Sequence, residues 1–154
     1  MAKEMFIEKS VVINKDVHEV FSFLQVTKNQ DKFSVWNMKD PTMKKTYTGI
    51  DGTKGFKYAW DSKDKNTGAG EQEITGIEED TLIRYHITFD RPMKNEATTE
   101  FRIDKVRENQ TSVTWAFASP TKFPMSLLTF LFKGMLGKQI EKSLGNLKTL
   151  LESR

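Results

Sequence analysis

The chain has 154 residues, a formal net charge of +3 and no cysteine. Its length suits one domain spanning residues 1–154, and 37% hydrophobic with 29% charged residues is typical of a globular protein. The lack of cysteine excludes disulfides, zinc–thiolate sites and thiol catalysis, and fits a reducing, cytoplasmic location. Lysines are scattered among acidic residues along the chain, which argues against nucleic acid as a partner.

Neither a signal peptide nor a transmembrane segment is expected. Charges at Lys3, Glu4, Glu8 and Lys9 interrupt any apolar run at the N-terminus. The apolar run at residues 125–132 is far shorter than the roughly 20 residues that a membrane span needs. Transient contact with a membrane stays open as a hypothesis, and the sequence does not indicate the oligomeric state.

The first predicted elements are a strand at residues 5–13 and a helix that follows at once. Asp16 is a suitable N-cap, and Glu19 three residues later completes a capping box. The helix then has an apolar stripe, made of Val17, Val20, Phe21 and Leu24 with Phe23 beside them. A short helical turn is predicted at residues 27–35, ending at Trp36 and Asn37, and Asp40-Pro41 stops any helix.

From residue 44 the hydrophobic period changes to two, which predicts a run of six antiparallel strands. Asp51-Gly52 is a hairpin signal, and the polar segments 62–70 and 90–95 are predicted loops. The strands are predicted at residues 44–48, 55–61, 71–77, 82–89, 97–103 and 113–117, the last ending before Pro120.

The last predicted element is one long helix at residues 124–153. Pro124 suits its first turn, where a missing N–H is tolerated. The first half is apolar nearly all round, and the second half has one apolar stripe, made of Ile140, Leu144, Leu147 and Leu151. Gly134 and Gly137 lie where the stripe moves by about a quarter turn, so we expect a bend or loosened packing there.

This order of elements indicates an α+β fold with helices packed on one face of the sheet. The inward faces are unusually aromatic, and each ring brings roughly 150–250 Å² of surface. One helix covers only part of a strongly curved sheet, so some of this surface should line a cavity between the sheet and the last helix.

The candidate ligand-binding residues are those expected on these inward faces. Gln72 and Thr99 are the polar groups expected to orient a ligand carbonyl or hydroxyl, and Tyr58 and Tyr85 can do the same. The competing interpretation is that the aromatic residues fill the core, with about a third of them touching a cavity. The full set is Trp36, Phe56, Tyr58, Trp60, Gln72, Tyr85, Phe89, Thr99, Phe101, Trp115, Phe117, Phe132, Met135 and Leu136.

The two histidines, His18 and His86, carry no predicted chemistry. They lie on separate elements without metal-ligand spacing, so no metal site is expected. A catalytic triad requires a histidine near a nucleophile and an acid, and nothing in the sequence places one there. We therefore assign no catalytic residue, metal or cofactor.

Glu71 and Glu73 share one face of a predicted strand. If that face met the cavity, one carboxylate with a raised pKa could act as a general base. Ile74 is the better inward marker, which places Gly70 and Gln72 inside and both glutamates in solvent.

Several segments resemble the polyketide cyclase/dehydrase and lipid-transport superfamily, also called SRPBCC or START-like. They are residues 16–24 with Trp36, the glycine-led segment 52–60, the pair 71–77 and 82–85, and the closing segment 134–152. The resemblance implies a helix-grip fold, in which a seven-stranded antiparallel sheet wraps the C-terminal helix around a hydrophobic cavity, with short helices after the first strand. Members include ligand carriers, cyclases, dehydratases, receptors and co-chaperones, without a universal catalytic motif, so the fold does not fix the function.

Three functional hypotheses follow. The leading one is non-catalytic binding of a small hydrophobic molecule such as a lipid, polyketide or aromatic metabolite, entering by the loops at 61–70 and 90–95. Affinity would come from apolar burial, roughly 25 cal/mol per Å². The second is an aromatase/cyclase or dehydratase that uses the same cavity and needs a titratable residue inside it. The third is a co-chaperone-like interaction module with an exposed surface at 125–136.

Overall fold

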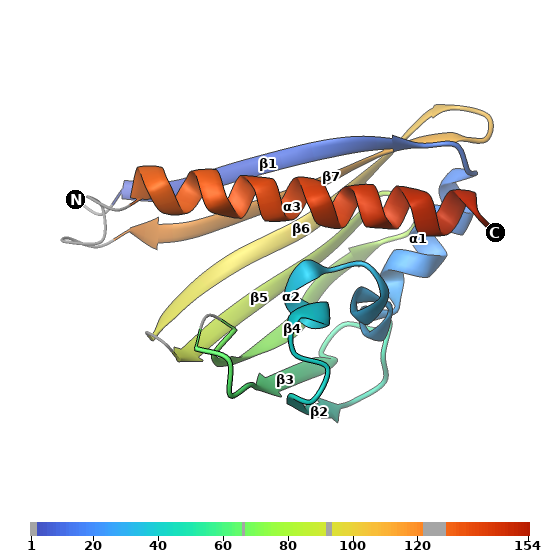
Figure 1. The fold of residues 1–154 in the computed structure, drawn as a ribbon. Helices are drawn as coiled ribbons and strands as arrows, with labels where there is room; N and C mark the ends of the chain where they lie inside the picture. Colours follow the sequence, from blue (N-terminus) through green and yellow to red (C-terminus); the bar gives the residue numbers. More distant parts are fainter. Residues whose placement is uncertain (1–2, 66, 92–93, 122–128) are drawn as a thin grey trace.

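The protein folds into a curved, seven-stranded antiparallel sheet with a long helix, α3 (Thr129–Glu152), lying along it (Figure 1). The computed structural model describes residues 3–65, 67–91, 94–121 and 129–154, without the side chains of 3–4, 121 and 129–132. This architecture confirms the helix-grip fold. The strands are β1 (Lys3–Ile13), β2 (Lys44–Thr48), β3 (Lys57–Asp61), β4 (Ala69–Glu78), β5 (Leu82–Arg91), β6 (Asn95–Arg107) and β7 (Gln110–Thr121).

The strand order is β1-β7-β6-β5-β4-β3-β2, so the chain crosses from one edge of the sheet to the other between β1 and β2. The crossing consists of α1 (Val17–Gln25), the 3₁₀ helix η1 (Thr27–Lys32) and α2 (Val35–Lys39). These short helices lie on the same side of the sheet as α3 (Figure 1). The predicted strands are confirmed. β7 continues through Pro120, which lies opposite Glu4 of β1, whereas pairing with β6 ends at Ala118. A proline there removes no hydrogen bond to β6.

The first helix begins as predicted, but its cap differs in detail. Asp16 accepts a hydrogen bond from the backbone N–H of His18 (3.0 Å). Glu19, expected to complete a capping box, instead pairs with Lys15 across 3.8 Å. The predicted apolar stripe is confirmed, with Val20, Phe21, Phe23 and Leu24 buried and Val17 packed against them.

The expectation that the second helical segment ends at Trp36 and Asn37 is wrong. Both residues lie inside α2, which ends at Lys39 with Asp40 as its C-cap. The backbone N–H of Met38 donates to the carbonyl of Ser34 (3.0 Å), so the chain resumes a helix after η1. The Asn37 amide also donates to Asp31 in η1 (2.9 Å), and the helix stops only before Pro41.

The apolar stripe of α3 packs on the sheet as predicted, since Ile140, Leu144, Leu147 and Leu151 are buried. Residues 124–128 of the predicted helix lie outside the described residues. The helix assignment of α3 continues through Gly134 and Gly137, and a Cβ at Gly134 would meet no atom within 4 Å. A Cβ at Gly137 would lie 2.8 Å from Cδ1 of Ile7 and 3.2 Å from Cε of Lys9, both on β1. Gly137 therefore allows α3 to approach β1 closely, the opposite of loosened packing.

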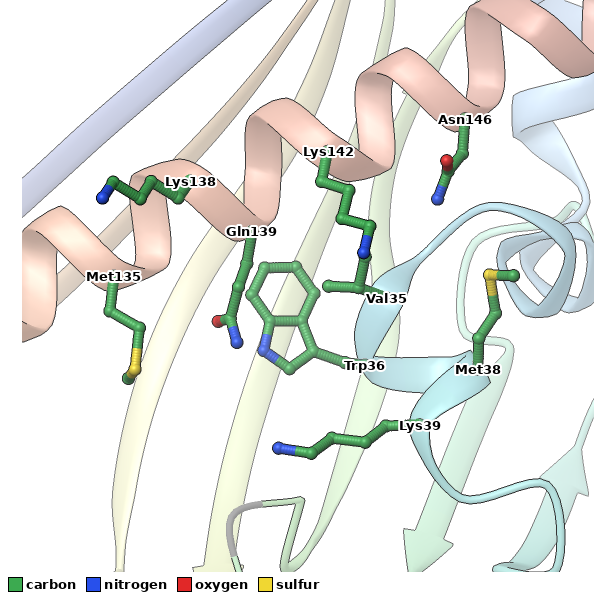
Figure 2. A pocket seen from close by; sticks show the side chains of 9 residues that line it. All are labelled: Val35, Trp36, Met38, Lys39, Met135, Lys138, Gln139, Lys142 and Asn146. Atoms are coloured by element: carbon green, nitrogen blue, oxygen red, sulfur yellow. The ribbon is translucent and has the colours of Figure 1, made fainter.

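Two hydrogen bonds tie α2 and the residues before it to the middle of α3. The backbone N–H of Val35 donates to Oγ of Ser143 (3.0 Å), and the Asn146 amide donates to the carbonyl of Phe33 (3.1 Å). Figure 2 shows the result, with Trp36 and Gln139 projecting from α2 and α3 into the space between the two helices. The position of Trp36 is thus fixed by a segment for which the sequence predicted only a turn.

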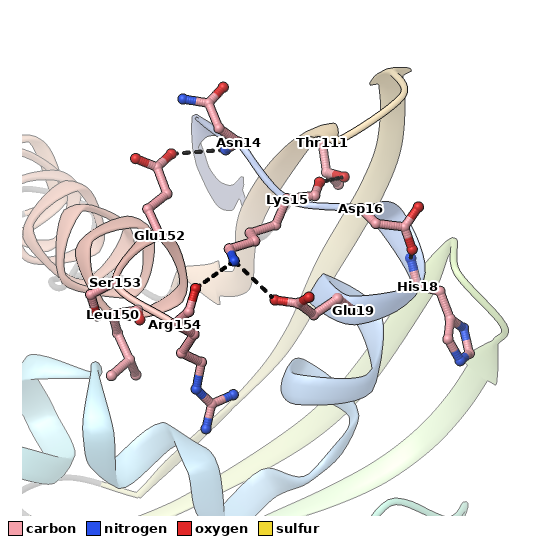
Figure 3. A network of polar contacts seen from close by, with 10 residues as sticks. All are labelled: Asn14, Lys15, Asp16, His18, Glu19, Thr111, Leu150, Glu152, Ser153 and Arg154. Atoms are coloured by element: carbon pink, nitrogen blue, oxygen red, sulfur yellow. Dashed lines mark hydrogen bonds and ion pairs between the residues drawn. The ribbon is translucent and has the colours of Figure 1, made fainter.

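The last turn of α3 is held against the end of β1 by a polar network (Figure 3). The Glu152 carboxylate accepts from the backbone N–H of Asn14 (2.8 Å), and the Lys15 ammonium donates to the main-chain oxygen of Arg154 (2.7 Å). The Lys148 ammonium donates to Glu152 (2.7 Å) and, together with the Asn14 bond, lowers the pKa of that carboxyl. These contacts fix one end of α3.

Gly70 permits a close approach of Trp60 that no other residue type would allow. A Cβ at Gly70 would lie 2.6 Å from the carbonyl oxygen of Thr88 and 2.7 Å from Cη2 of Trp60.

Because the backbone oxygen of Thr88 has little freedom to move, we expect Gly70→Ala to lower the free energy of unfolding by about 1–3 kcal/mol, measured by urea denaturation. Gly76→Ala is the matched control on β4, since its nearest neighbour, Cβ of Arg84, is at 3.8 Å. Equal stability of the two variants would contradict this explanation.

Candidate functional site

A cavity of about 530 Å³ lies between the sheet, α2 and α3. Its walls come from β1 and β3 to β7, from η1 and α2, and from the inner side of α3. Ten of the fourteen candidate residues line it: Trp36, Tyr58, Trp60, Gln72, Phe89, Thr99, Trp115, Phe117, Met135 and Leu136.

The other four candidates do not contribute described side chains to the cavity lining. Phe56, Tyr85 and Phe101 are fully or almost fully buried in the core. Phe101 packs against Trp115, with ring centroids 4.7 Å apart, and against Tyr85 at 6.1 Å. Phe132 lies in α3, but its side chain is outside the described residues.

Each inward strand face is divided between core and cavity. On β6, Thr99 faces the cavity and Phe101, two residues later, lies in the core. On β5, Phe89 lines the cavity and Tyr85 belongs to the core. The division depends on Phe33, between η1 and α2, which packs against Phe101 (6.2 Å) and Trp115 (6.1 Å) and so fills one end of the space.

Six aromatic side chains form part of the cavity wall. Trp36 of α2 meets Trp115 of β7 edge-on, with ring centroids 5.9 Å apart. On the other side, Trp60 stacks beside Tyr58 (6.0 Å) and meets Phe89 edge-on (6.1 Å). These ring contacts fix the walls and leave an apolar space between them.

Neutral polar groups gather in the buried part of the cavity. Gln72 donates to Gln30 across 3.5 Å, and Gln30 was missed by the sequence interpretation because it lies in a polar turn. The Tyr58 hydroxyl is buried and has no hydrogen-bond partner among the described residues. Burial raises the pKa of Tyr58, with a smaller contribution from the Asp31 carboxylate, so the phenol stays neutral and can donate. The Thr99 hydroxyl likewise has no hydrogen-bonding partner in the described chain.

The charged groups of the cavity lie at its rim. Among the described lining residues, these are Lys39 and Arg91, and there is no aspartate, glutamate or histidine. Arg91 is paired with Asp61, and the Lys39 ammonium lies 3.9 Å from Asp64. General acid–base chemistry would have to use these groups or the neutral Tyr58 phenol.

The glutamates and histidines considered earlier lie outside the cavity. Glu71 is exposed and Glu73 lies on the same outward face of β4, while Gln72 between them is buried. His18 contacts Asp80 at 2.8 Å, and this carboxylate raises the pKa of the imidazole. His86 lies 3.5 Å from Glu96 on the outer face. Within the described chain, no group of three or more potential ligands could hold a metal ion.

Further residues of the lining come from connecting segments and α3. The cavity reaches Thr67 in the loop before β4 and Arg91 and Asn95 at the ends of β5 and β6, which belong to the predicted entry loops. It also reaches Lys39 and Gln139, where it meets a second hollow between α2 and α3. No helix in the described ranges is long and apolar enough to cross a membrane.

Solved structures of similar fold match nearly the whole chain. An uncharacterised protein from Rhizobium leguminosarum has 11% identity and a TM-score of 0.69, covering 100% of this chain and 98% of that chain. Norcoclaurine synthase from Thalictrum flavum, in complex with dopamine and hydroxybenzaldehyde, has 8% identity and a TM-score of 0.75, covering 99% and 90%. The di-domain ARO/CYC protein StfQ from the steffimycin biosynthetic pathway has 12% identity and a TM-score of 0.70, covering 98% and 51%.

At these identities the structural likeness establishes the fold alone. No curated protein matches the sequence. The family model described as polyketide cyclase / dehydrase and lipid transport matches residues 6–152, which is almost the entire chain. This protein therefore belongs to the polyketide cyclase/dehydrase and lipid transport family.

Proposed function

We propose that this protein binds a small hydrophobic molecule, such as a lipid, a polyketide or an aromatic metabolite, in the cavity between the sheet and α3, without transforming it. The observation that carries the proposal is the cavity of about 530 Å³ with aromatic walls. Its volume lies within the roughly 300–1,000 Å³ of small-molecule sites, which combine apolar walls with a few polar groups. Family membership and the fold support the same conclusion.

Binding affinity would come mainly from burying apolar ligand surface against the aromatic walls, roughly 25 cal/mol per Å². Orientation would come from Tyr58, Gln72 and Thr99. The Tyr58 hydroxyl is buried without a partner, which costs free energy unless a ligand accepts its hydrogen bond. A ligand carbonyl or hydroxyl near Tyr58 would remove that cost.

The cyclase or dehydratase hypothesis ranks second. Such an enzyme needs a titratable group beside the reacting atoms, with a pKa matched to its task. The described lining offers Tyr58, whose raised pKa keeps it neutral, and cations at the rim that face carboxylates. The co-chaperone hypothesis rests on residues 125–136, most of which lie outside the described side chains.

Native mass spectrometry of freshly purified protein, followed by extraction, tests the proposal. We expect a stoichiometric apolar adduct, or saturable binding of decanol measured by calorimetry on the delipidated protein. The absence of both an adduct and decanol binding would mean that the aromatic walls close on one another. Conversion of an extracted ligand by the protein would favour the enzyme hypothesis instead.

A further inference from the structure

The groove between α2 and α3 joins the cavity and has a basic lining (Figure 2). Its volume is about 490 Å³, and its charged residues are Lys39 on α2 and Lys138 and Lys142 on α3. None of the described groove residues is acidic. A concave site with several cations and no anion has a positive potential that attracts anionic groups.

The positive charge of the groove is poorly compensated. Lys148, further along α3, is bonded to Glu152 at 2.7 Å, whereas Lys138 and Lys142 form no ion pair in the described part of the chain. The ammonium of Lys39 lies 3.9 Å from Asp64, at the limit of an ion pair. The other cation of the cavity lining, Arg91, is already paired with Asp61. The α2–α3 side is therefore the rim that can best accept a negative charge.

The groove and the cavity share lining residues, so one elongated molecule could occupy both. Trp36, Lys39, Met135 and Gln139 line both spaces. Met38 and Met135 are half-exposed apolar side chains in the groove, with 50% and 52% of their surface accessible. The shared boundary therefore combines apolar surface, which suits a hydrocarbon, with an ammonium group, which suits an acid.

We propose that this groove binds the acidic headgroup of the ligand, so that the protein selects monomeric hydrophobic molecules carrying a carboxylate or phosphate. The inference rests on the proposed function and specifies its ligand class. The apolar part would lie among the aromatic side chains of the cavity, and the headgroup would contact the groove lysines. The concave shape favours a single molecule over a membrane surface, which would require a flatter basic patch.

Calorimetric titration with decanoate and with decanol tests this proposal, because the two differ mainly in headgroup charge. We expect the double variant Lys138→Gln/Lys142→Gln, at two unpaired lysines that line the groove and not the cavity, to bind decanoate about fivefold to tenfold more weakly, as expected for two rim charges. Decanol affinity should change by less than about twofold, since no charge is involved. Raising the ionic strength from about 0.01 M to about 0.15 M should weaken decanoate binding to the wild-type protein more than to the double variant, which keeps one groove lysine.

The matched control is Lys54→Gln/Lys105→Gln, which removes the same charge from two exposed lysines that line neither space. Equal decanoate affinities for both double variants would overturn the headgroup site while leaving decanol binding, and so the proposed function, intact. Failure of wild-type protein to bind either ligand would overturn both. Unchanged decanoate binding, with reduced co-sedimentation on phosphatidylglycerol vesicles, would assign the groove to a membrane and overturn the proposal.

Discussion

Replacing Phe101 with alanine is expected to lower the free energy of unfolding by about 3–5 kcal/mol, the usual cost of removing a buried phenylalanine ring. Phe101 has no exposed surface and packs against Trp115, Tyr85 and Phe33. Its removal leaves a void between rings that the surrounding strands hold in place, so little collapse can compensate for the lost contacts. Chemical denaturation of both proteins measures the difference.

Two further variants make the result interpretable. Phe6→Ala removes a ring from β1 that is 45% exposed, so we expect a much smaller loss of stability. Phe101→Leu keeps most of the apolar volume and should remain folded, with decanol affinity close to wild type because Phe101 does not line the cavity. A Phe101→Leu protein of wild-type stability that no longer binds decanol would place this residue in the site rather than the core.

The fold was predictable because each element carries its own local signal. The strand at residues 44–48 was predicted with the bounds of β2, and the stripe from Ile140 to Leu151 identified the packed face of α3. Gln72 was placed inside and its neighbouring glutamates outside from the period of two alone. The alternation of inward and outward side chains is a property of the strand itself, so it can be predicted without knowing what covers the sheet.

What covers each part of the sheet was not predictable in the same way. Thr99 and Phe101 lie on the same face of one strand, yet Thr99 lines the cavity while Phe101 packs in the core against Phe33 and other rings. Gly137 was predicted to mark a bend or loosened packing, yet its lack of a side chain allows close contact with Ile7 of β1. Both features depend on contacts between segments more than 60 positions apart.

The polar groups of the cavity were also difficult to predict from the sequence. Gln30 belongs to a short polar segment that has no hydrophobic period, so nothing in its neighbourhood indicated burial. The partner of Gln30 is Gln72, on β4. An amide pair of this kind can be recognised only once η1 has been placed over the sheet.

Replacing Thr99 with phenylalanine is expected to weaken decanol binding at least tenfold while leaving the protein folded. Thr99 is buried on the inward face of β6 and lines the cavity. Its side chain has no hydrogen bond to lose within the described chain. A ring that excludes about 60 Å² of ligand surface removes about 1.5 kcal/mol of binding free energy, which corresponds to about tenfold.

The stability of the same variant distinguishes an open cavity from a filled one. In an open cavity the new ring occupies free space, so the free energy of unfolding should fall by less than about 1 kcal/mol or rise. In a filled cavity, overpacking should lower it by about 1–3 kcal/mol. Thr98→Phe is the control, because Thr98 is exposed on the outer face of the same strand and should leave decanol affinity unchanged. Loss of affinity in Thr99→Phe alone, without loss of stability, would locate the ligand between β6 and α3. Equal affinities in the two variants would exclude this cavity as the binding site.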